Sequence, residues 1–194
     1  LAEEAFEAGR ISISRGDRDL GLELLLEGVS FHEQVYGLVH PEVARCYALF
    51  ATIVHHLAGV VAMERAELIN QAKAENRELT DADLPPVNEH LSMSNAVRYQ
   101  RQAVTVSERT LGLDHPETLN QYMNLAVLER SAGNTRESLL CQRRVLELWS
   151  LLYGKEHPDC MNALSNVALT LQNARLFEAS LRVYRSAHEL ALSL

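Results

Sequence analysis

Three histidines, each followed directly by proline, are the residues whose type and repeated setting first point to chemistry. They are His40, His115 and His157, and an imidazole nitrogen is a common metal ligand. The last two are 42 residues apart and the first two are 75 apart, which exceeds 42 by 33. Equivalent residues in successive repeats stand roughly 10 Å apart, much farther than the ligands of one ion. We therefore expect turn residues here, with no metal and no cofactor.

The residues around each His-Pro predict the end of one helix and the start of the next. The glycine before and the acid after are Gly37 and Glu42, Gly112 and Glu117, and Gly154 and Asp159. Glycine closes a helix in the left-handed conformation, and proline fits the first turn of the following helix. The acid stabilises the positive end of the helix dipole. Each block is thus predicted to be a helix, a short turn and a second helix.

Between these blocks, apolar residues such as Leu119, Met123 and Ala126 recur at intervals of three and four, which is typical of amphipathic helices. The segments therefore form antiparallel helix pairs. We predict an all-α protein, an α-solenoid of tetratricopeptide-like architecture in one domain, 1–194. Its pairs are expected at 1–37, 38–111, 112–153 and 154–194.

Small residues recur in phase with the pairs, and eleven of twelve such positions are Gly, Ala or Ser. Small side chains let neighbouring helices approach closely. In the first helix the equivalent positions are Gly9, Ala51, Ala126 and Ala168. In the second helix they are Gly21, Ala96, Ser138 and Ser180, followed by Gly28, Ala103, Val145 and Ala187.

An insertion of 33 residues, at about 60–93, separates the helices of the second pair. Its first part, from Val60 to about Glu78, has a helical pattern of apolar residues. The following stretch, 79–86, is acidic and rich in helix breakers, which predicts a loop. Two interpretations stay open, a long flexible loop or a docking element, since insertions in repeats often lie on a functional face.

Composition limits the classes of function. The 18 basic and 26 acidic residues give a net charge of −8, which disfavours general coating of nucleic acid. Three cysteines without paired spacing favour a reducing compartment, and no apolar run approaches the roughly 20 residues of a membrane span. No phosphate loop or nucleophile motif is present. We expect a cytoplasmic, non-enzymatic protein without membrane insertion, excised from a larger protein because it begins at Leu1.

Helix pairs of this period resemble tetratricopeptide repeats, and the 42-residue form with Gly-x-x-His-Pro is similar to the repeats of kinesin light chains. Residues 36–47, 107–118 and 122–126 look like the clustered-mitochondria (Clu) family. The resemblance spans the chain apart from the insertion. It implies the C-terminal repeat domain of a large cytosolic protein associated with mitochondrial distribution. It also implies contact with messenger RNAs for mitochondrial proteins and with the translation-initiation machinery.

The first helices of the pairs are expected to line a concave groove that binds peptide segments or partner domains, including other domains of the same parent. An asparagine amide donates and accepts hydrogen bonds, so it can hold a peptide backbone whatever the side chains. The resemblance implies this role for Asn124 and Asn166; the alternative is that they bond within the solenoid or face water. The predicted groove residues are Glu3, Glu7, Arg10, Arg45, Leu49, Thr52, Asn120, Asn124, Val127, Asn162, Asn166 and Leu169. Because Glu7 and Leu49 replace asparagine in the first two pairs, we expect any clamp in the C-terminal half.

A second hypothesis follows from the bias toward arginine over lysine. Arginine stacks on bases and binds phosphates with two parallel hydrogen bonds, so a ridge of arginines on the outer helices could contact RNA directly. Ordinary pairing with acids one turn away explains the same residues. The residues of this ridge are Arg98, Arg101, Arg109, Arg136, Arg143, Arg144, Arg182 and Arg185.

Overall fold

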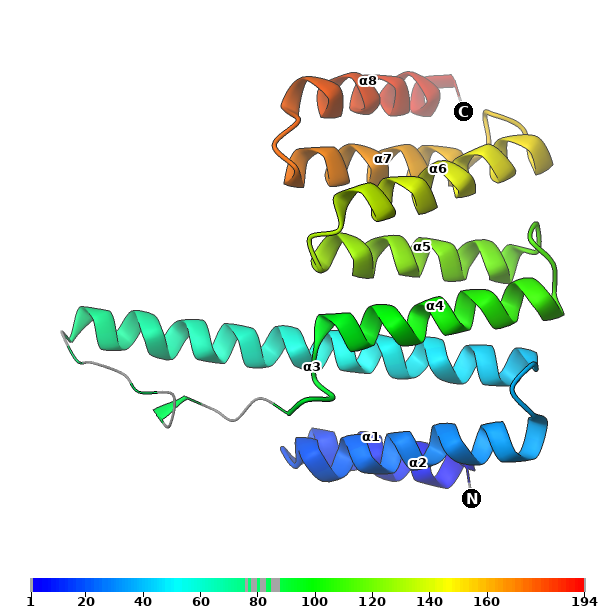
Figure 1. Cartoon of the computed structure of the whole chain (residues 1–194). Helices are drawn as coiled ribbons and strands as arrows, with labels where there is room; N and C mark the ends of the chain where they lie inside the picture. Colours follow the sequence, from blue (N-terminus) through cyan, green and yellow to red (C-terminus); the bar gives the residue numbers. More distant parts are fainter. Residues whose placement is uncertain (1, 76, 78–79, 81–82, 85–87, 194) are drawn as a thin grey trace. The chain divides into compact units, whose positions relative to one another are not determined.

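The computed structural model describes residues 2–75, 77, 80, 83–84 and 88–193. Across these residues the chain forms eight helices and no strand (Figure 1), which confirms the all-α prediction. The helices are α1 (Ala2–Ser14), α2 (Arg18–Tyr36), α3 (Pro41–Ala74), α4 (Met93–Thr110), α5 (Pro116–Ser131), α6 (Thr135–Leu152), α7 (Pro158–Asn173) and α8 (Phe177–Ser193). They group into two compact units, residues 1–106 and 107–194, which we describe separately.

In the first unit, α1 and α2 approach so closely that two facing glycines leave no room for side chains. A Cβ on Gly9 would lie 2.9 Å from the carbonyl oxygen of Gly21, and one on Gly21 would lie 2.9 Å from that of Gly9. Helices α3 and α4 meet through an edge-to-face contact of Phe50 with Tyr99, whose ring centroids are 4.6 Å apart. The largest fully buried apolar side chains of this unit are Leu22, Leu25, Val43, Phe50 and Val54.

In the second unit, serines take the place of the glycine on the second helix of each pair. The Ser138 hydroxyl of α6 donates to the carbonyl of Ala126 on α5 at 2.7 Å, and Ser180 of α8 donates to Ala168 of α7 at 2.8 Å. Each serine hydroxyl thus has a hydrogen-bond partner, without which its burial would be costly. All twelve of the predicted small-residue positions are buried in their respective units. This pattern is the close helix packing of a tetratricopeptide-like repeat.

The His-Pro blocks build the starts of α3, α5 and α7. Nδ1 of His40 and of His115 accepts the backbone N–H two residues later at 3.2 Å, and Nδ1 of His157 does so at 3.3 Å. Proline occupies the first turn in each case. Before it, Gly112 has φ of 100° and Gly154 φ of 90°, which favours glycine. The histidines are N-caps, so their predicted role as turn residues is confirmed.

The insertion begins as an uninterrupted continuation of α3, which runs for 34 residues and ends at Ala74. Figure 1 shows this helix extending well beyond α1 and α2. The predicted helical stretch to about Glu78 is therefore shorter at its end, and residues 76, 78–79, 81–82 and 85–87 of the insertion lie outside the described residues. Side-chain hydrogen bonds of described residues join the insertion to α2. Arg18 donates to Glu64 at 2.6 and 2.8 Å, and the Asn88 amide donates to Asp19 at 2.6 Å.

One helix among the described residues, α3, is long enough and apolar enough to cross a membrane, judged by length and composition alone. Much of that apolar character belongs to the core of the first unit, because Val43, Phe50 and Val54 are almost completely buried there. The core helix of a repeat accounts for the same composition. The expectation that the chain does not insert into a membrane stays a prediction.

Candidate peptide-binding groove

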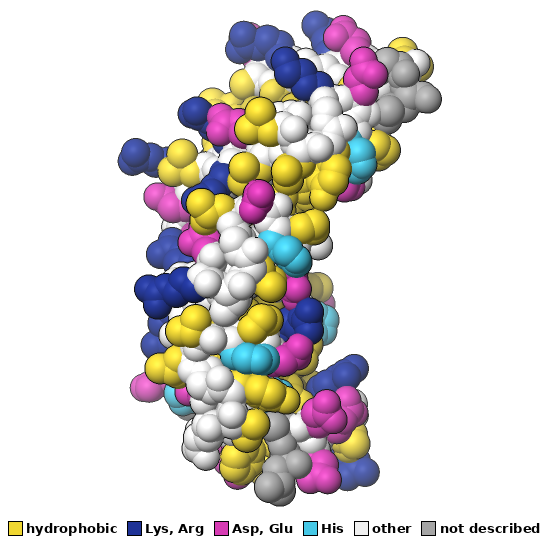
Figure 2. All heavy atoms as spheres, turned by 90° about the vertical axis from the view of Figure 1, so that its right-hand side faces the viewer, with side chains coloured by type: hydrophobic (Ala, Val, Ile, Leu, Met, Phe, Trp, Pro, Cys, Tyr) yellow, Lys and Arg dark blue, Asp and Glu magenta, His cyan; other side chains and the backbone are white. Residues whose placement is uncertain are grey.

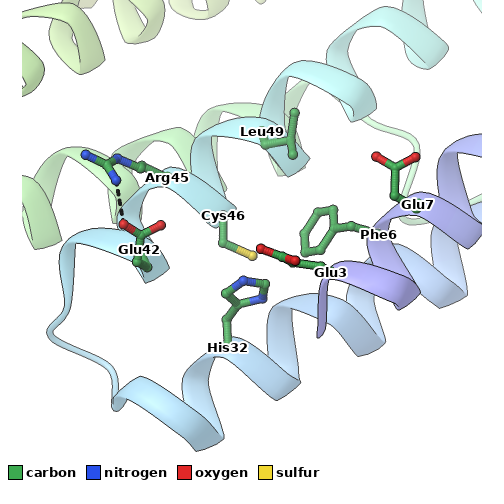
Figure 3. A pocket seen from close by; sticks show the side chains of 8 residues that line it. All are labelled: Glu3, Phe6, Glu7, His32, Glu42, Arg45, Cys46 and Leu49. Carbon is green, nitrogen blue, oxygen red and sulfur yellow. Dashed lines mark hydrogen bonds and ion pairs between the residues drawn. The ribbon is translucent and has the colours of Figure 1, made fainter. Parts of the chain in front are cut away.

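The first unit is hollowed along α1 and α3 in two places that share Leu49. One hollow has a volume of about 370 Å³ and the other about 430 Å³. The first is lined by Glu3, Phe6, Glu7, His32, Glu42, Arg45, Cys46 and Leu49 (Figure 3). The second is lined by Arg10, Ile13, Ser14, Leu49, Thr52, Ile53, His56 and Leu57. Together these residues form what we call the α1–α3 groove.

All six groove residues predicted for this unit line the α1–α3 groove. They are Glu3, Glu7 and Arg10 on α1, and Arg45, Leu49 and Thr52 on α3. Residues spaced by three and four share one face of a helix, and close packing of α1 against its neighbours turns that face toward α3. In the first hollow, sequence reasoning missed Phe6, His32, Glu42 and Cys46. Of these, only His32 lies on α2, the second helix of its pair, so a groove assigned to the first helices alone leaves it out. Phe6, Glu42 and Cys46 lie on α1 and α3, next to or one turn from residues that the helical period did single out.

The floor of the first hollow is apolar and its rim is acidic. Phe6 and Cys46 are buried, and the Phe6 ring meets the His32 ring edge-on with centroids 5.6 Å apart. The His32 Nδ1–H donates to the Gly28 carbonyl at 2.8 Å, which fixes the orientation of the ring. Burial raises the pKa of the Cys46 thiol to about 12, so the sulfur is an uncharged part of the floor.

Three carboxylates and one guanidinium line this hollow. Arg45 forms an ion pair with Glu42 on the same helix, and Arg10 of the neighbouring hollow pairs with Glu7 at 3.1 Å. Both pairs are exposed, so each contributes little to stability and can exchange partners with a ligand. Glu3 adds a further negative charge beside them. The groove therefore suits a segment that carries an apolar side chain next to a basic one.

In the second unit, the predicted asparagines lie on α5 and α7. Asn120, Asn124 and Asn162 are exposed and Asn166 is half-buried. Within the described part of the chain, none of these four side-chain amides makes a hydrogen bond to another residue. The Asn166 backbone carbonyl accepts from Thr170 at 2.9 Å and from Gln142 at 3.3 Å, which anchors its main chain. Val127 is half-buried, and Leu169 is 36% exposed.

Several of the arginines of the predicted ridge already have partners. In the second unit, Arg143 pairs with Glu147 at 2.7 Å, and Arg144 pairs with Glu108 at 3.1 Å while it stacks on the Tyr122 ring. In the first unit, Arg98 lies over the Tyr99 ring. The arginines of the predicted ridge that are exposed to solvent are Arg98, Arg101, Arg109, Arg136, Arg143, Arg182 and Arg185. On the face shown in Figure 2, basic side chains are interspersed with acidic and apolar ones rather than gathered alone. Direct RNA contact stays a prediction.

These helix pairs, with their buried small residues and groove, define the chain as a tetratricopeptide-repeat protein. Models described as tetratricopeptide repeat match residues 119–193 and 94–117. The crystal structure of BtubC (BKLC) from P. vanneervenii has the same fold, with a TM-score of 0.65 at 14% identity. That likeness covers 100% of this chain and 64% of the other. The fold predicted from the repeat is confirmed, and it is that of a non-catalytic scaffold family.

The resemblance to the clustered-mitochondria family is also confirmed. The chain is 93% identical over all 194 residues to the clustered mitochondria protein homolog of Mycosarcoma maydis. It is 50% identical over 154 residues to the homolog of Malassezia globosa, covering 69% of this chain and 12% of the relative. The chain spans 14% of the length of the Mycosarcoma maydis relative.

Proposed function

We propose that the chain is a protein-interaction scaffold whose α1–α3 groove holds a segment of a partner protein or of another domain of its parent. The observation that carries this proposal is the gathering of Glu3, Phe6, Leu49 and Ile53 along one groove with an apolar floor and an acidic rim. Apolar pockets beside a few placed charges are the usual form of a ligand site. A bound segment would bury an apolar side chain and place a basic one near the carboxylates.

We further propose that the amides of Asn124 and Asn166 make a second contact surface in the other unit. The support is that both side chains lack a hydrogen bond among the described residues, while their helices are held by buried contacts. Amides in that state can pair with the backbone of an extended peptide. The double variant Asn124→Ala/Asn166→Ala then weakens capture of those partners that depend on this surface, with unchanged helicity.

The test of the groove uses two matched leucines of the first unit. Leu49 is 44% exposed at the point shared by both hollows, and Leu20 on α2 is 47% exposed outside them. The variant Leu49→Arg places a charge on the groove floor, whereas Leu20→Arg changes the surface charge equally at another place. Affinity capture with the 194-residue chain loses its partners with Leu49→Arg and keeps them with Leu20→Arg. Equal capture by the two variants contradicts the groove.

The name of the relatives supports a place for the parent protein in mitochondrial distribution, and we propose a cytoplasmic location for it. Messenger RNA and the translation-initiation machinery are partners that we assign to the parent rather than to this groove, because the rim is acidic. A nuclease step in the same capture experiment separates these cases. Partners that survive nuclease and disappear with Leu49→Arg belong to the groove, and partners lost to nuclease are held through RNA.

A further inference from the structure

A buried tyrosine and a glutamate join two successive helix pairs in the same way at two places. In the first unit, the Tyr47 hydroxyl of α3 donates to Glu33 of α2 at 2.6 Å. In the second unit, the Tyr122 hydroxyl of α5 donates to Glu108 of α4. The two residues are 14 apart in both cases, and the rings are only 5% and 8% exposed. In each joint, the phenol therefore fills the space between the helices.

The third joint, between α6 and α7, lacks both members of this pair. The residues 42 positions after Glu108 and Tyr122 are Ser150 and Leu164. Both side chains are shorter, and a cavity of about 300 Å³ lies between them. It is lined by Leu146, Glu147, Ser150, Lys155, Cys160 and Leu164. Most of this lining is apolar.

Helices α6 and α7 remain in contact near the cavity. Nearby, the Gln142 amide of α6 donates to the buried Thr170 hydroxyl of α7 at 2.8 Å. Trp149, next to Ser150, is 7% exposed, and Cys160 is 1% exposed. The two helices are thus in contact beside the cavity, and the residues next to it are buried.

We propose that this cavity binds the phenol ring of a tyrosine from a partner protein. The other two joints show that a phenol fits this place between two helices of the repeat. The Ser150 hydroxyl donates to the Glu147 carbonyl at 2.9 Å, so its lone pairs can accept a hydrogen bond from the phenol. The Glu147 carboxylate, which also lines the cavity, is paired with Arg143 at 2.7 Å, and Ser150 occupies the position that holds the glutamate in the other joints. The proposal concerns the second unit and does not depend on the α1–α3 groove.

Two contributions favour the binding of a tyrosine side chain in this cavity. The ring replaces water on an apolar wall, and the hydroxyl keeps a hydrogen-bond partner, which is the combination that buried tyrosines need. A phenylalanine ring also displaces water from the apolar wall, but it has no hydroxyl to donate a hydrogen bond to Ser150. A leucine leaves part of the cavity empty, so its contact is weaker than that of either ring.

The test is a nuclear magnetic resonance titration of the ¹⁵N-labelled 194-residue chain with three blocked peptides, Gly-Tyr-Gly, Gly-Phe-Gly and Gly-Leu-Gly. We expect the tyrosine peptide to shift the amide signals of Cys160 and Leu164 with a dissociation constant on the order of 1 mM, as for small ligands. The phenylalanine peptide binds several-fold more weakly and the leucine peptide weakest. Equal shifts with all three peptides, or none with the tyrosine peptide, overturn the proposal.

Variants of the chain supply the controls. The double variant Ser150→Glu/Leu164→Tyr rebuilds the pair of the other joints, fills the cavity and lowers binding at least tenfold. Leu151→Tyr adds a tyrosine at a neighbouring position that is 80% exposed and leaves binding unchanged. Ser150→Ala keeps the cavity open and removes the preference for tyrosine over phenylalanine, which keeps the test decisive if the double variant does not fold. Tyrosine preference that persists in Ser150→Ala contradicts the proposed contact.

Discussion

Substituting Gly21 by alanine tests the close approach of α1 and α2 that shapes the wall of the groove. Alanine is favoured over glycine in a helix by about 1 kcal/mol, so the substitution would stabilise the protein if the added methyl group had open space around it. At Gly21, however, a Cβ would meet Cγ1 of Ile13, the backbone nitrogen of Ile13 at 3.1 Å and the carbonyl oxygen of Gly9 at 2.9 Å. Two of these neighbours are backbone atoms, so relief requires the helices to separate. Overpacking of this kind costs about 1–3 kcal/mol, which equals or exceeds the helical gain.

We therefore expect Gly21→Ala to lower the free energy of unfolding by up to about 2 kcal/mol after the helical gain is subtracted. The matched control is Gly59→Ala in α3, where nothing lies within 4 Å of the added Cβ and only the gain of about 1 kcal/mol applies. Urea unfolding followed by circular dichroism compares the two variants. With a slope of about 2 kcal/mol/M, the midpoint falls by up to about 1 M for Gly21→Ala and rises by about 0.5 M for Gly59→Ala. Stabilisation by both alanines would refute the close approach. Reduced partner capture with Gly21→Ala alone would connect the approach to the groove.

Three further predictions follow from the caps, the buried serines and one histidine. His115→Ala removes the N-cap acceptor of α5 and costs about 1 kcal/mol in thermal unfolding, whereas His115→Asn restores an acceptor and recovers most of that loss. Ser138→Ala removes the buried bond to the Ala126 carbonyl and costs about 1 kcal/mol; a cost no larger than that of an exposed Ser30→Ala variant would contradict the contact. Burial, aided by the charge of His56, lowers the pKa of His55 from its ordinary value near 6.5. The stability that the neutral His55 contributes is complete above pH 6.5 and is lost as the pH falls toward the lower pKa of the folded state. The variant His55→Gln should therefore flatten the dependence of the unfolding free energy on pH below 6.5. Urea titrations at stepped pH measure this dependence.

The sequence by itself determined the helix boundaries at the His-Pro blocks, the buried small residues and the faces that carry Glu3, Arg45 and Leu49. These features depend on interactions over a few residues, namely caps, backbone conformation and the three- to four-residue period of one helix.

Only the tertiary structure decided how residues distant in the chain meet. His32 and Cys46 meet in one hollow, and the partner of Arg144 is Glu108 on another helix. The uninterrupted length of α3 and the cavity at Ser150 and Leu164 were also visible only there. Such contacts depend on how helices cross and on which side chains are too short to fill the space between them, and sequence period does not specify either.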